Sequence, residues 1–382
     1  MPQDPPARPR IAPLRLEQFD PEARALVERP GGFGRVLNVM ATLANHLLFK
    51  TSLPVRDREI LILRVAWLTG SIYEWGQHLA IAAEEAGFGK REFAAVAAGA
   101  DAPGWTAHER ALIRAADGLY RDAFVDDATW SVLAMHFDEP QCLDVLFTIG
   151  NYILLAMALN AFGVPLDEGY AGFAADLPRS EQGPPDALPP MAVRRPEPRL
   201  PPVPESDLSP EQKELVVKAR GPLPSLNVVE TVVRHPALLR RWRPFFNHCL
   251  HKSTLPPRER EILILRVGRL CGAEYEWAQH APLAERAGLS RTEIAGIAEG
   301  PSAAVWTADL DRALIEAADQ LHRSTDIDDA LWQRLARHYD TPQMMDLVFT
   351  VGQYRLVLAV LNSLCVPLDS YLPRFEDTVR TT

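Results

Sequence analysis

The chain repeats itself, and this duplication constrains its fold more than any other feature of the sequence. Arg58–Val65 reads REILILRV, and the same eight residues return at Arg260–Val267, 202 positions later. Further short segments recur in the same order at the same spacing, among them Tyr73-Glu74-Trp75 with Tyr275-Glu276-Trp277, Gln77-His78 with Gln279-His280, and Val164–Asp167 with Val366–Asp369. Chance does not produce such collinear matches, so most of the 382 residues belong to two tandem copies of one domain.

Proline marks the segments that lie outside the two copies. Of the 33 prolines, seven fall in residues 1–30 and thirteen in residues 178–224. Such composition favours extended, semi-rigid chain. We therefore expect four parts, namely a proline-rich N-terminal segment over 1–34, copy one over 35–172, a proline-rich linker over 173–221 and copy two over 222–375. The stretch from Asn38 to Glu59 is shorter than that from Asn227 to Glu261, so copy one is expected to lack a segment around His235-Pro236.

Each copy is predicted to be all-helical. Runs of Ala, Leu, Glu and Arg dominate both copies, and alternating strand patterns are scarce. Capping and stop signals predict the helices of copy one, which are expected over 54–70, over 71–86, in a short segment after Gly87, from the capping box Thr106-x-x-Glu109, from Asp126-Asp127, and over 139–162. Short helices with one apolar stripe must pack together, so the expected fold class is an all-α bundle in two tandem copies.

Composition excludes several classes of protein. The net charge of −10 argues against a nucleic-acid partner, which requires a basic footprint. The N-terminus has no apolar region typical of a signal peptide. The four cysteines form neither a CxxC pair nor a zinc-ligand spacing. We therefore expect a cytoplasmic protein with free thiols. The uncharged stretch between Asp144 and Asp167 is long enough to cross a bilayer, but its duplicate carries Arg355, which favours a buried helix of a soluble protein.

Three polar residues recur in both copies within apolar helix, namely Glu59, Glu74 and His78 in copy one and Glu261, Glu276 and His280 in copy two. Glu74 and His78 are i, i+4 neighbours on one helix face. A carboxylate beside an imidazole orients the ring and raises its pKa, which suits a general acid or base. The preceding helix could bring Glu59 to the same point. The alternatives are a structural polar cluster between helices, or an iron, manganese or zinc site.

Other repeated residues are weaker candidates. Tyr73 and Tyr275 serve either packing or donation from a phenol into a pocket. His46 and His248 lie either at the surface or at the mouth of a pocket. Arg64 and Arg266 either pair with an acid or receive a substrate carboxylate.

Together these residues carry a family resemblance. The pattern Arg-Glu, apolar helix, Gly-x-x-Tyr-Glu-Trp-x-x-His and closing Asn-x-x-x-Val-Pro-Leu resembles the carboxymuconolactone decarboxylase family, whose sister branch is the AhpD-like alkylhydroperoxidases. The resemblance covers residues of about 35–170 and 222–372, and it implies an AhpD-like helical bundle. The peroxidases carry Cys-x-x-Cys before the final His, because one thiolate attacks the peroxide and a second thiol resolves the product. Those positions are Ser71 and Glu74 in copy one and Ala273 and Glu276 in copy two.

The decarboxylase branch is therefore the better match. It implies cofactor-independent loss of CO2 from, or isomerisation of, a small carboxylic acid or lactone, with no metal. His78 and His280 would carry the proton, Glu74 and Glu276 would orient them, and Glu59 and Glu261 would be second acids. Single-copy relatives assemble into rings, so the resemblance also implies a homo-oligomer. The competing functional hypothesis is a non-catalytic helical scaffold or small-molecule-binding protein, and a thiol peroxidase is the third.

Overall fold

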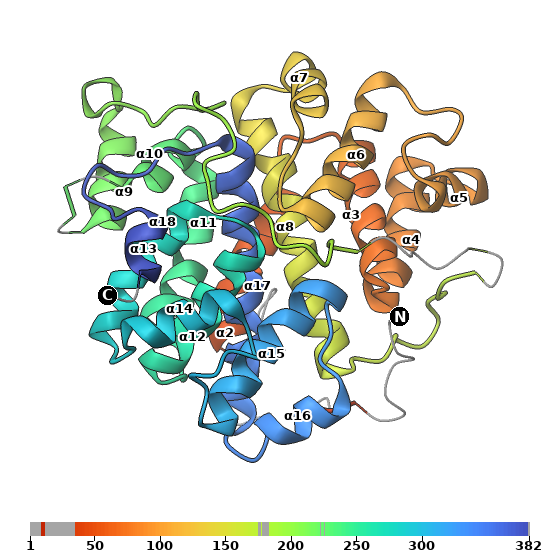
Figure 1. Ribbon diagram of the computed structural model, residues 1–382. Helices are drawn as coiled ribbons and strands as arrows, with labels where there is room; N and C mark the ends of the chain where they lie inside the picture. Colours follow the sequence, from red (N-terminus) through yellow and green to blue (C-terminus); the bar gives the residue numbers. More distant parts are fainter. Residues whose placement is uncertain are drawn as a thin grey trace.

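Helices form all the regular secondary structure in the described part of the chain. The computed structural model describes residues 9–11, 35–174, 177, 183–221, 223–224 and 226–380, so most of the predicted N-terminal segment over 1–34 lies outside the described residues. Copy one comprises α2 (Arg35–Phe49), α3 (Val55–Thr69), α4 (Ile72–Ala86), α5 (Lys90–Ala98), α6 (Ala107–Asp122), α7 (Asp127–His136) and α8 (Glu139–Phe162) (Figure 1). Copy two comprises α10 (Asn227–Val232), α11 (Pro236–Asn247), the π-helical η3 (His248–Lys252), α12 (Pro257–Leu270), α13 (Glu274–Arg286), α14 (Arg291–Glu299), α15 (Asp309–Ser324), α16 (Asp329–Leu335) and α17 (Thr341–Leu364), followed by α18 (Phe375–Val379).

The helix boundaries predicted for copy one agree with the structure. The Thr106 hydroxyl accepts a hydrogen bond from the Glu109 backbone N–H at the start of α6, as a capping box requires. Helix α8 has the predicted bounds, and Gly163 ends it with a φ of 67°, a left-handed conformation that glycine adopts at little cost. These boundaries depend on local chemistry, which the sequence displays directly.

The predicted linker is not extended throughout. Within it lie a short 3-10 turn, η2 (Glu205–Asp207), and a helix, α9 (Pro210–Arg220). Ser209 caps α9 by accepting from the Gln212 N–H, and Leu215 and Val216 are buried where α9 packs on α10 and α11. The prediction of an extended linker is therefore wrong for its last part, because a capping box and an apolar stripe outweigh the proline content.

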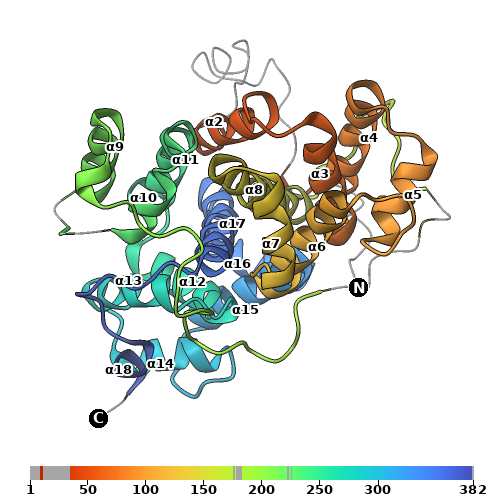
Figure 2. The same cartoon turned by 90° about the horizontal axis from the view of Figure 1, so that it is seen from above.

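The expected absence of a segment from copy one rests on matching Asn38 with Asn227, and the structure does not support that match. Asn38 lies inside α2, whereas Asn227 begins α10, so the two asparagines are not equivalent. At the 202-residue spacing, α2 corresponds instead to α11 and η3, and these helices pack side by side (Figure 2). The counterparts of His235-Pro236 are then Phe33-Gly34.

The two copies meet most extensively where α8 crosses α17 at the centre of the molecule (Figure 2). Gly150 of α8 faces Leu356 of α17, and Gly352 of α17 faces Leu154 of α8. A Cβ added at Gly150 would lie 2.7 Å from the Leu356 Cγ, and one at Gly352 would lie 2.8 Å from the Leu154 Cγ. The reciprocal contacts show that the copies pair with approximate two-fold symmetry, and that glycine permits their close approach.

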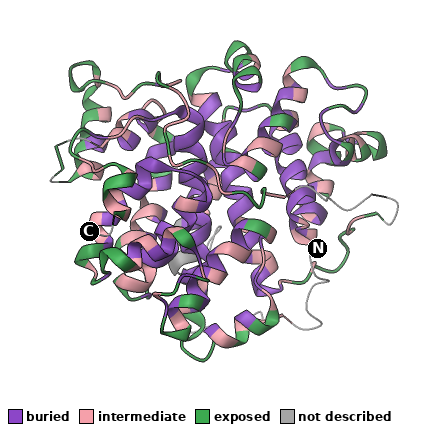
Figure 3. Cartoon of the chain, in the orientation of Figure 1, coloured by how far each residue is buried: buried purple, intermediate pink, exposed green. Residues whose placement is uncertain are grey.

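The copies share one apolar core (Figure 3). Helices α8 and α17 are long and apolar enough to span a membrane, but most of each is buried inside the protein, as in the core helices of a soluble protein. Arg355 of α17 also crosses the boundary, since its Nη2 donates to the carbonyls of Leu119 and Tyr120, at 2.8 Å each, near the end of α6. A cation placed there complements the helix dipole.

The close crossing of α8 and α17 predicts that Gly→Ala substitutions will change stability differently at different glycines. We expect Gly150→Ala and Gly352→Ala each to lower the free energy of unfolding by about 1–3 kcal/mol, because the added methyl overlaps a leucine side chain. Gly268→Ala in α12 is the matched control, since its Cβ would meet nothing within 4 Å. There the better helix propensity of alanine should leave stability unchanged or higher by up to about 1 kcal/mol. Urea unfolding of the three variants tests this, and equal stabilities would contradict it.

Candidate functional site

The predicted glutamate and histidine side chains meet in both copies. Glu59 of α3 accepts a hydrogen bond from His78 of α4, with 2.7 Å between Oε2 and Nδ1. Glu261 of α12 and His280 of α13 form the same bond at the same distance. Both glutamates are completely buried, and both histidines are at least 95% buried. Each copy therefore holds an oriented imidazole inside a helical pair.

In both copies the shortest contact of the histidine is with the glutamate of the preceding helix. Glu74 and Glu276 were expected to orient the histidines through their i, i+4 spacing, but Glu59 and Glu261 on the preceding helix bind Nδ1 instead. In copy two, the Glu276 Oε2 lies 3.4 Å from the other ring nitrogen of His280, Nε2. The imidazole of copy two is thus placed between two carboxyl groups.

An arginine fixes each orienting glutamate from the preceding position in the chain. The Arg58 Nε donates to the Glu59 Oε1 at 2.9 Å, and the Arg260 Nη2 donates to the Glu261 Oε1 at 3.1 Å. One carboxylate oxygen therefore binds the guanidinium while the other binds the imidazole. In copy two, burial works against a charged Glu261, but His280 and Arg260 overcome it and lower the pKa of this glutamate. The Arg-Glu pair was visible in the repeated sequence, but its role was not.

Two tyrosines complete the surroundings and were missed by the sequence analysis. The Tyr152 ring of α8 stands edge-on to His78, with centroids 5.1 Å apart, and the Tyr354 ring of α17 stands likewise to His280 at 5.0 Å. The Tyr354 hydroxyl is buried and has no hydrogen-bond partner. Their recurrence within two long apolar helices at the 202-residue spacing was the available signal.

The two copies differ in the second carboxyl group. Both oxygens of Glu74 are buried without a hydrogen-bond partner, and burial raises the pKa of Glu74 well above its usual value, which favours the neutral carboxyl group. In copy two, burial works against a charged His280, but Glu261 and Glu276 overcome it and raise the pKa of His280 to about 9. Copy two therefore holds an imidazolium at neutral pH.

The predicted arginine and tyrosine ligands lie outside these clusters. The Arg64 Nε binds Asp117 at 2.6 Å, and the Arg266 Nε binds Asp319 at 2.6 Å, while both guanidiniums also donate to backbone carbonyls. They take the structural alternative, and we do not retain them as substrate ligands.

Tyr73 and Tyr275 also have structural partners. Their hydroxyls donate to Asp167 at 2.9 Å and to Asp369 at 2.7 Å, which hold the closing Val-Pro-Leu-Asp segment of each copy against α4 or α13. Gln77 and Gln279 donate to the same carboxylates. The repeated Tyr-Glu-Trp-x-Gln-His element thus joins two tasks, since Tyr and Gln anchor a loop while Glu and His face the interior.

His46 and His248 are buried rather than at the surface. The His248 Nε2 lies 2.9 Å from the Asp346 Oδ1, and the His46 Nε2 lies 3.6 Å from the Asp144 Oδ1. Their partners lie on α17 and α8. The hydrogen bonds and ion pairs described for these histidines do not reach the Glu–His pair of their copy, and a role at the mouth of a pocket stays a prediction.

Comparison with known proteins agrees with this architecture. The model of the carboxymuconolactone decarboxylase family matches the chain twice, over residues 35–118 and 236–320, whereas no curated protein matches. The matched segments contain both Glu–His pairs and fit the all-α AhpD-like fold. The chain therefore carries two tandem domains of the carboxymuconolactone decarboxylase family.

Proposed function

We propose that this protein is an acid–base enzyme that decarboxylates or isomerises a small carboxylic acid or lactone, with the histidine of a buried Glu–His pair as its proton carrier. The observation that carries the proposal is the 2.7 Å bond between Glu261 and His280 with Glu276 at the opposite ring nitrogen. The same pair recurs as Glu59 and His78. A buried, oriented imidazole with a raised pKa is what proton transfer to carbon requires.

In the proposed reaction, the proton is transferred from Nε2 of His280. Because Glu261 holds Nδ1, the proton available to a substrate is the one on Nε2 of His280. Glu276 lies 3.4 Å from that nitrogen and marks where a polar substrate group would contact the ring. With a pKa of about 9, His280 carries this proton at neutral pH and serves as the general acid.

In the proposed decarboxylation, the substrate loses CO2 and gains one proton at carbon. The bond between the carboxylate carbon and the lactone breaks, and CO2 leaves without its bonding electrons. Those electrons pass through the conjugated alkene to the lactone carbonyl and form a dienolate, which a nearby donor would stabilise. His280 then transfers its Nε2 proton to carbon and regains a proton from water. An isomerisation would use the same imidazole to remove one proton and return it elsewhere.

Thiol peroxide chemistry is poorly supported. All four cysteines are buried, and no two of them form a disulfide. Burial raises the pKa of Cys142 to about 12 and raises the pKa of Cys271 as well, so neither thiol is a thiolate at neutral pH. The thiolate is the nucleophile in peroxide reduction.

Removing the proton carriers tests the proposed function. We expect His280→Gln to lower kcat for CO2 release from a carboxymuconolactone by about 10²–10⁴-fold, and His78→Gln combined with it to abolish the remainder. In D2O the wild-type product should carry deuterium at the reprotonated carbon. His338→Gln is the matched control, because His338 is an exposed histidine of the same copy. Full activity in the folded double variant would contradict the proposed role of the histidines, whereas a wild type that releases no CO2 would favour the non-catalytic scaffold.

The raised pKa of His280 makes a separate prediction about stability. The folded-state pKa of about 9 exceeds the ordinary value of 6.5, so His280 stabilises the protein fully below pH 6.5. That contribution is lost as pH rises from 6.5 through 9. We therefore expect the free energy of unfolding of the wild type to fall more steeply between pH 6.5 and 8.5 than that of His280→Gln. Urea titrations at several pH values measure both slopes, and identical slopes would rule out the buried imidazolium.

A further inference from the structure

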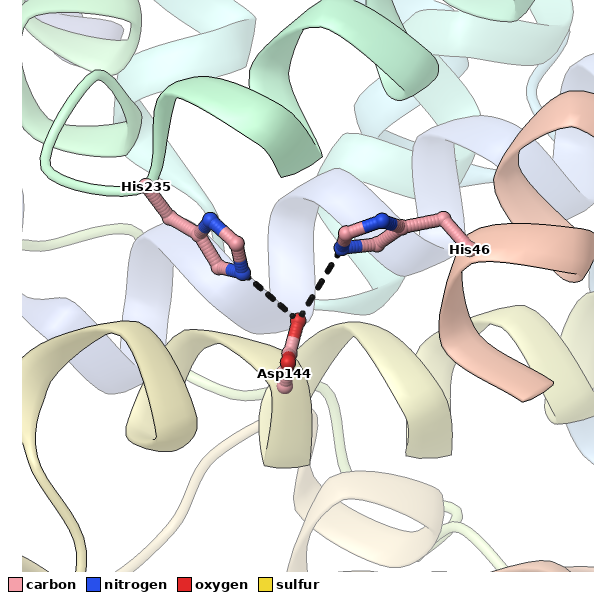
Figure 4. Close-up of side chains that lie close together, drawn as sticks. All are labelled: His46, Asp144 and His235. Carbon is pink, nitrogen blue, oxygen red and sulfur yellow. Dashed lines mark hydrogen bonds and ion pairs between the residues drawn. The ribbon is translucent and has the colours of Figure 1, made fainter. Parts of the chain in front are cut away.

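A second histidine cluster lies where copy two packs onto copy one, apart from the Glu–His pairs. His46 lies on α2 and Asp144 lies on α8. His235 is the residue that caps the N-terminus of α11. The Asp144 Oδ1 lies 3.1 Å from the His235 Nε2 and 3.6 Å from the His46 Nε2. Figure 4 shows both imidazoles directing a nitrogen toward this one carboxylate. Three elements thus present three metal-binding atoms to one point, all within 4.8 Å of one another.

The donor set and its spacing fit a transition-metal ion. Two imidazole nitrogens and one carboxylate oxygen are common ligands of zinc and of other divalent first-row metals. Bonds of about 2.0–2.1 Å to a tetrahedral ion place ligand atoms about 3.3 Å apart. The observed separations of 3.1 and 3.6 Å lie on either side of that value.

One ligand atom has no hydrogen-bond partner within the protein. The His46 side chain is 4% exposed, and its Nε2 has no hydrogen-bond partner because Asp144 is beyond hydrogen-bond length. A buried polar nitrogen left unpaired costs free energy, and such atoms are rare in folded proteins. A metal ion at this point would satisfy the nitrogen, which a direct bond to Asp144 does not.

Neighbouring groups prepare the carboxylate for this role. The Thr51 hydroxyl donates to the Asp144 Oδ2 at 2.6 Å, which leaves Oδ1 facing the two histidines. Hydrogen bonds of this kind orient metal ligands and tune their basicity.

His235 must change one contact when its Nε2 binds a metal. Its Nδ1 accepts a long, 3.4 Å hydrogen bond from the Leu238 backbone N–H at the start of α11. An imidazole that binds a metal through Nε2 carries its proton on Nδ1, so this contact would be given up. A hydrogen bond of that length is weak, and one metal bond exceeds its contribution.

Copy two contains the same pair without the third ligand. His248 and Asp346 stand at the 202-residue spacing from His46 and Asp144, and they form a direct 2.9 Å hydrogen bond. No other histidine, cysteine or acid completes a ligand set there among the residues that the structure describes. The sequence position that matches His235 is Phe33. The chain therefore supplies its own comparison between a bonded pair and an open three-ligand cluster.

We propose that His46, Asp144 and His235 bind one divalent transition-metal ion, with zinc as the best fit, and that this ion joins α11 of copy two to α2 and α8 of copy one. The ion would act as a staple between the copies, with water at its fourth position. The proposal stands independently of the Glu–His chemistry, which uses no residue of this cluster.

Metal titration of the full-length protein tests the proposal. After chelator treatment, we expect one Co2+ per chain to bind with the visible absorption of a tetrahedral site and to be displaced by one Zn2+. Zn2+ should also raise Tm, because it binds the folded state alone. His46→Gln and His235→Phe should weaken binding at least about 10-fold and remove the Tm shift. His248→Gln should bind metal like the wild type.

A separate cluster in copy one provides the sharpest control. Asp57, His108 and His136 also bring three possible ligands together, at a more exposed place in copy one. If His108→Gln abolishes Co2+ binding while His235→Phe retains it, the proposed site is wrong. Absence of stoichiometric binding at micromolar Co2+ or Zn2+ in the wild type would overturn it too. Should the variants fail to fold, X-ray absorption of wild-type protein loaded with Zn2+ decides, since the proposal requires two imidazole ligands and one carboxylate.

Discussion

The close crossing of α8 and α17 is the contact on which the rest of the structure depends. Gly150 and Gly352 let the two longest helices approach until each glycine meets a leucine of the other copy. Both helices are buried almost throughout, so they supply the centre of a core that neither copy could close alone. They also carry Tyr152 and Tyr354 beside the histidines, and Asp144 and Asp346 beside a second histidine in each copy.

The duplication has produced two chemically different halves. In copy two, Glu276 reaches His280, whereas the corresponding Glu74 has no hydrogen-bond partner. In copy one, Asp144 meets a second imidazole, His235, that comes from copy two. Arg355 caps α6 of copy one, but its own counterpart is Ile153. Fusion in one chain allows this divergence, because each half can specialise for its fixed neighbour.

The part of the candidate site that sequence reasoning found was the part encoded by repetition. Glu59, Glu74 and His78 stood out as polar residues retained twice in apolar helix, and the structure brings Glu59 and His78 into contact. Their roles could not be predicted from spacing. An i, i+4 separation shows that two side chains are neighbours on one helix, but it does not show whether a carboxylate on the next helix lies closer. Tyr152 and Tyr354 were missed because an aromatic residue within an apolar helix resembles ordinary core.

The sequence by itself determined the duplication, the all-helical fold, and helix boundaries such as that of α8, because caps, glycines and repeated motifs act over a few residues. Only the tertiary structure decided which carboxylate orients each histidine, that Arg64 and Arg266 serve internal ion pairs, and that α9 folds within the proline-rich linker. It alone brought His235 to His46 and Asp144. These outcomes depend on the packing of helices that are far apart in the chain, and no local pattern records which side chains that packing brings together.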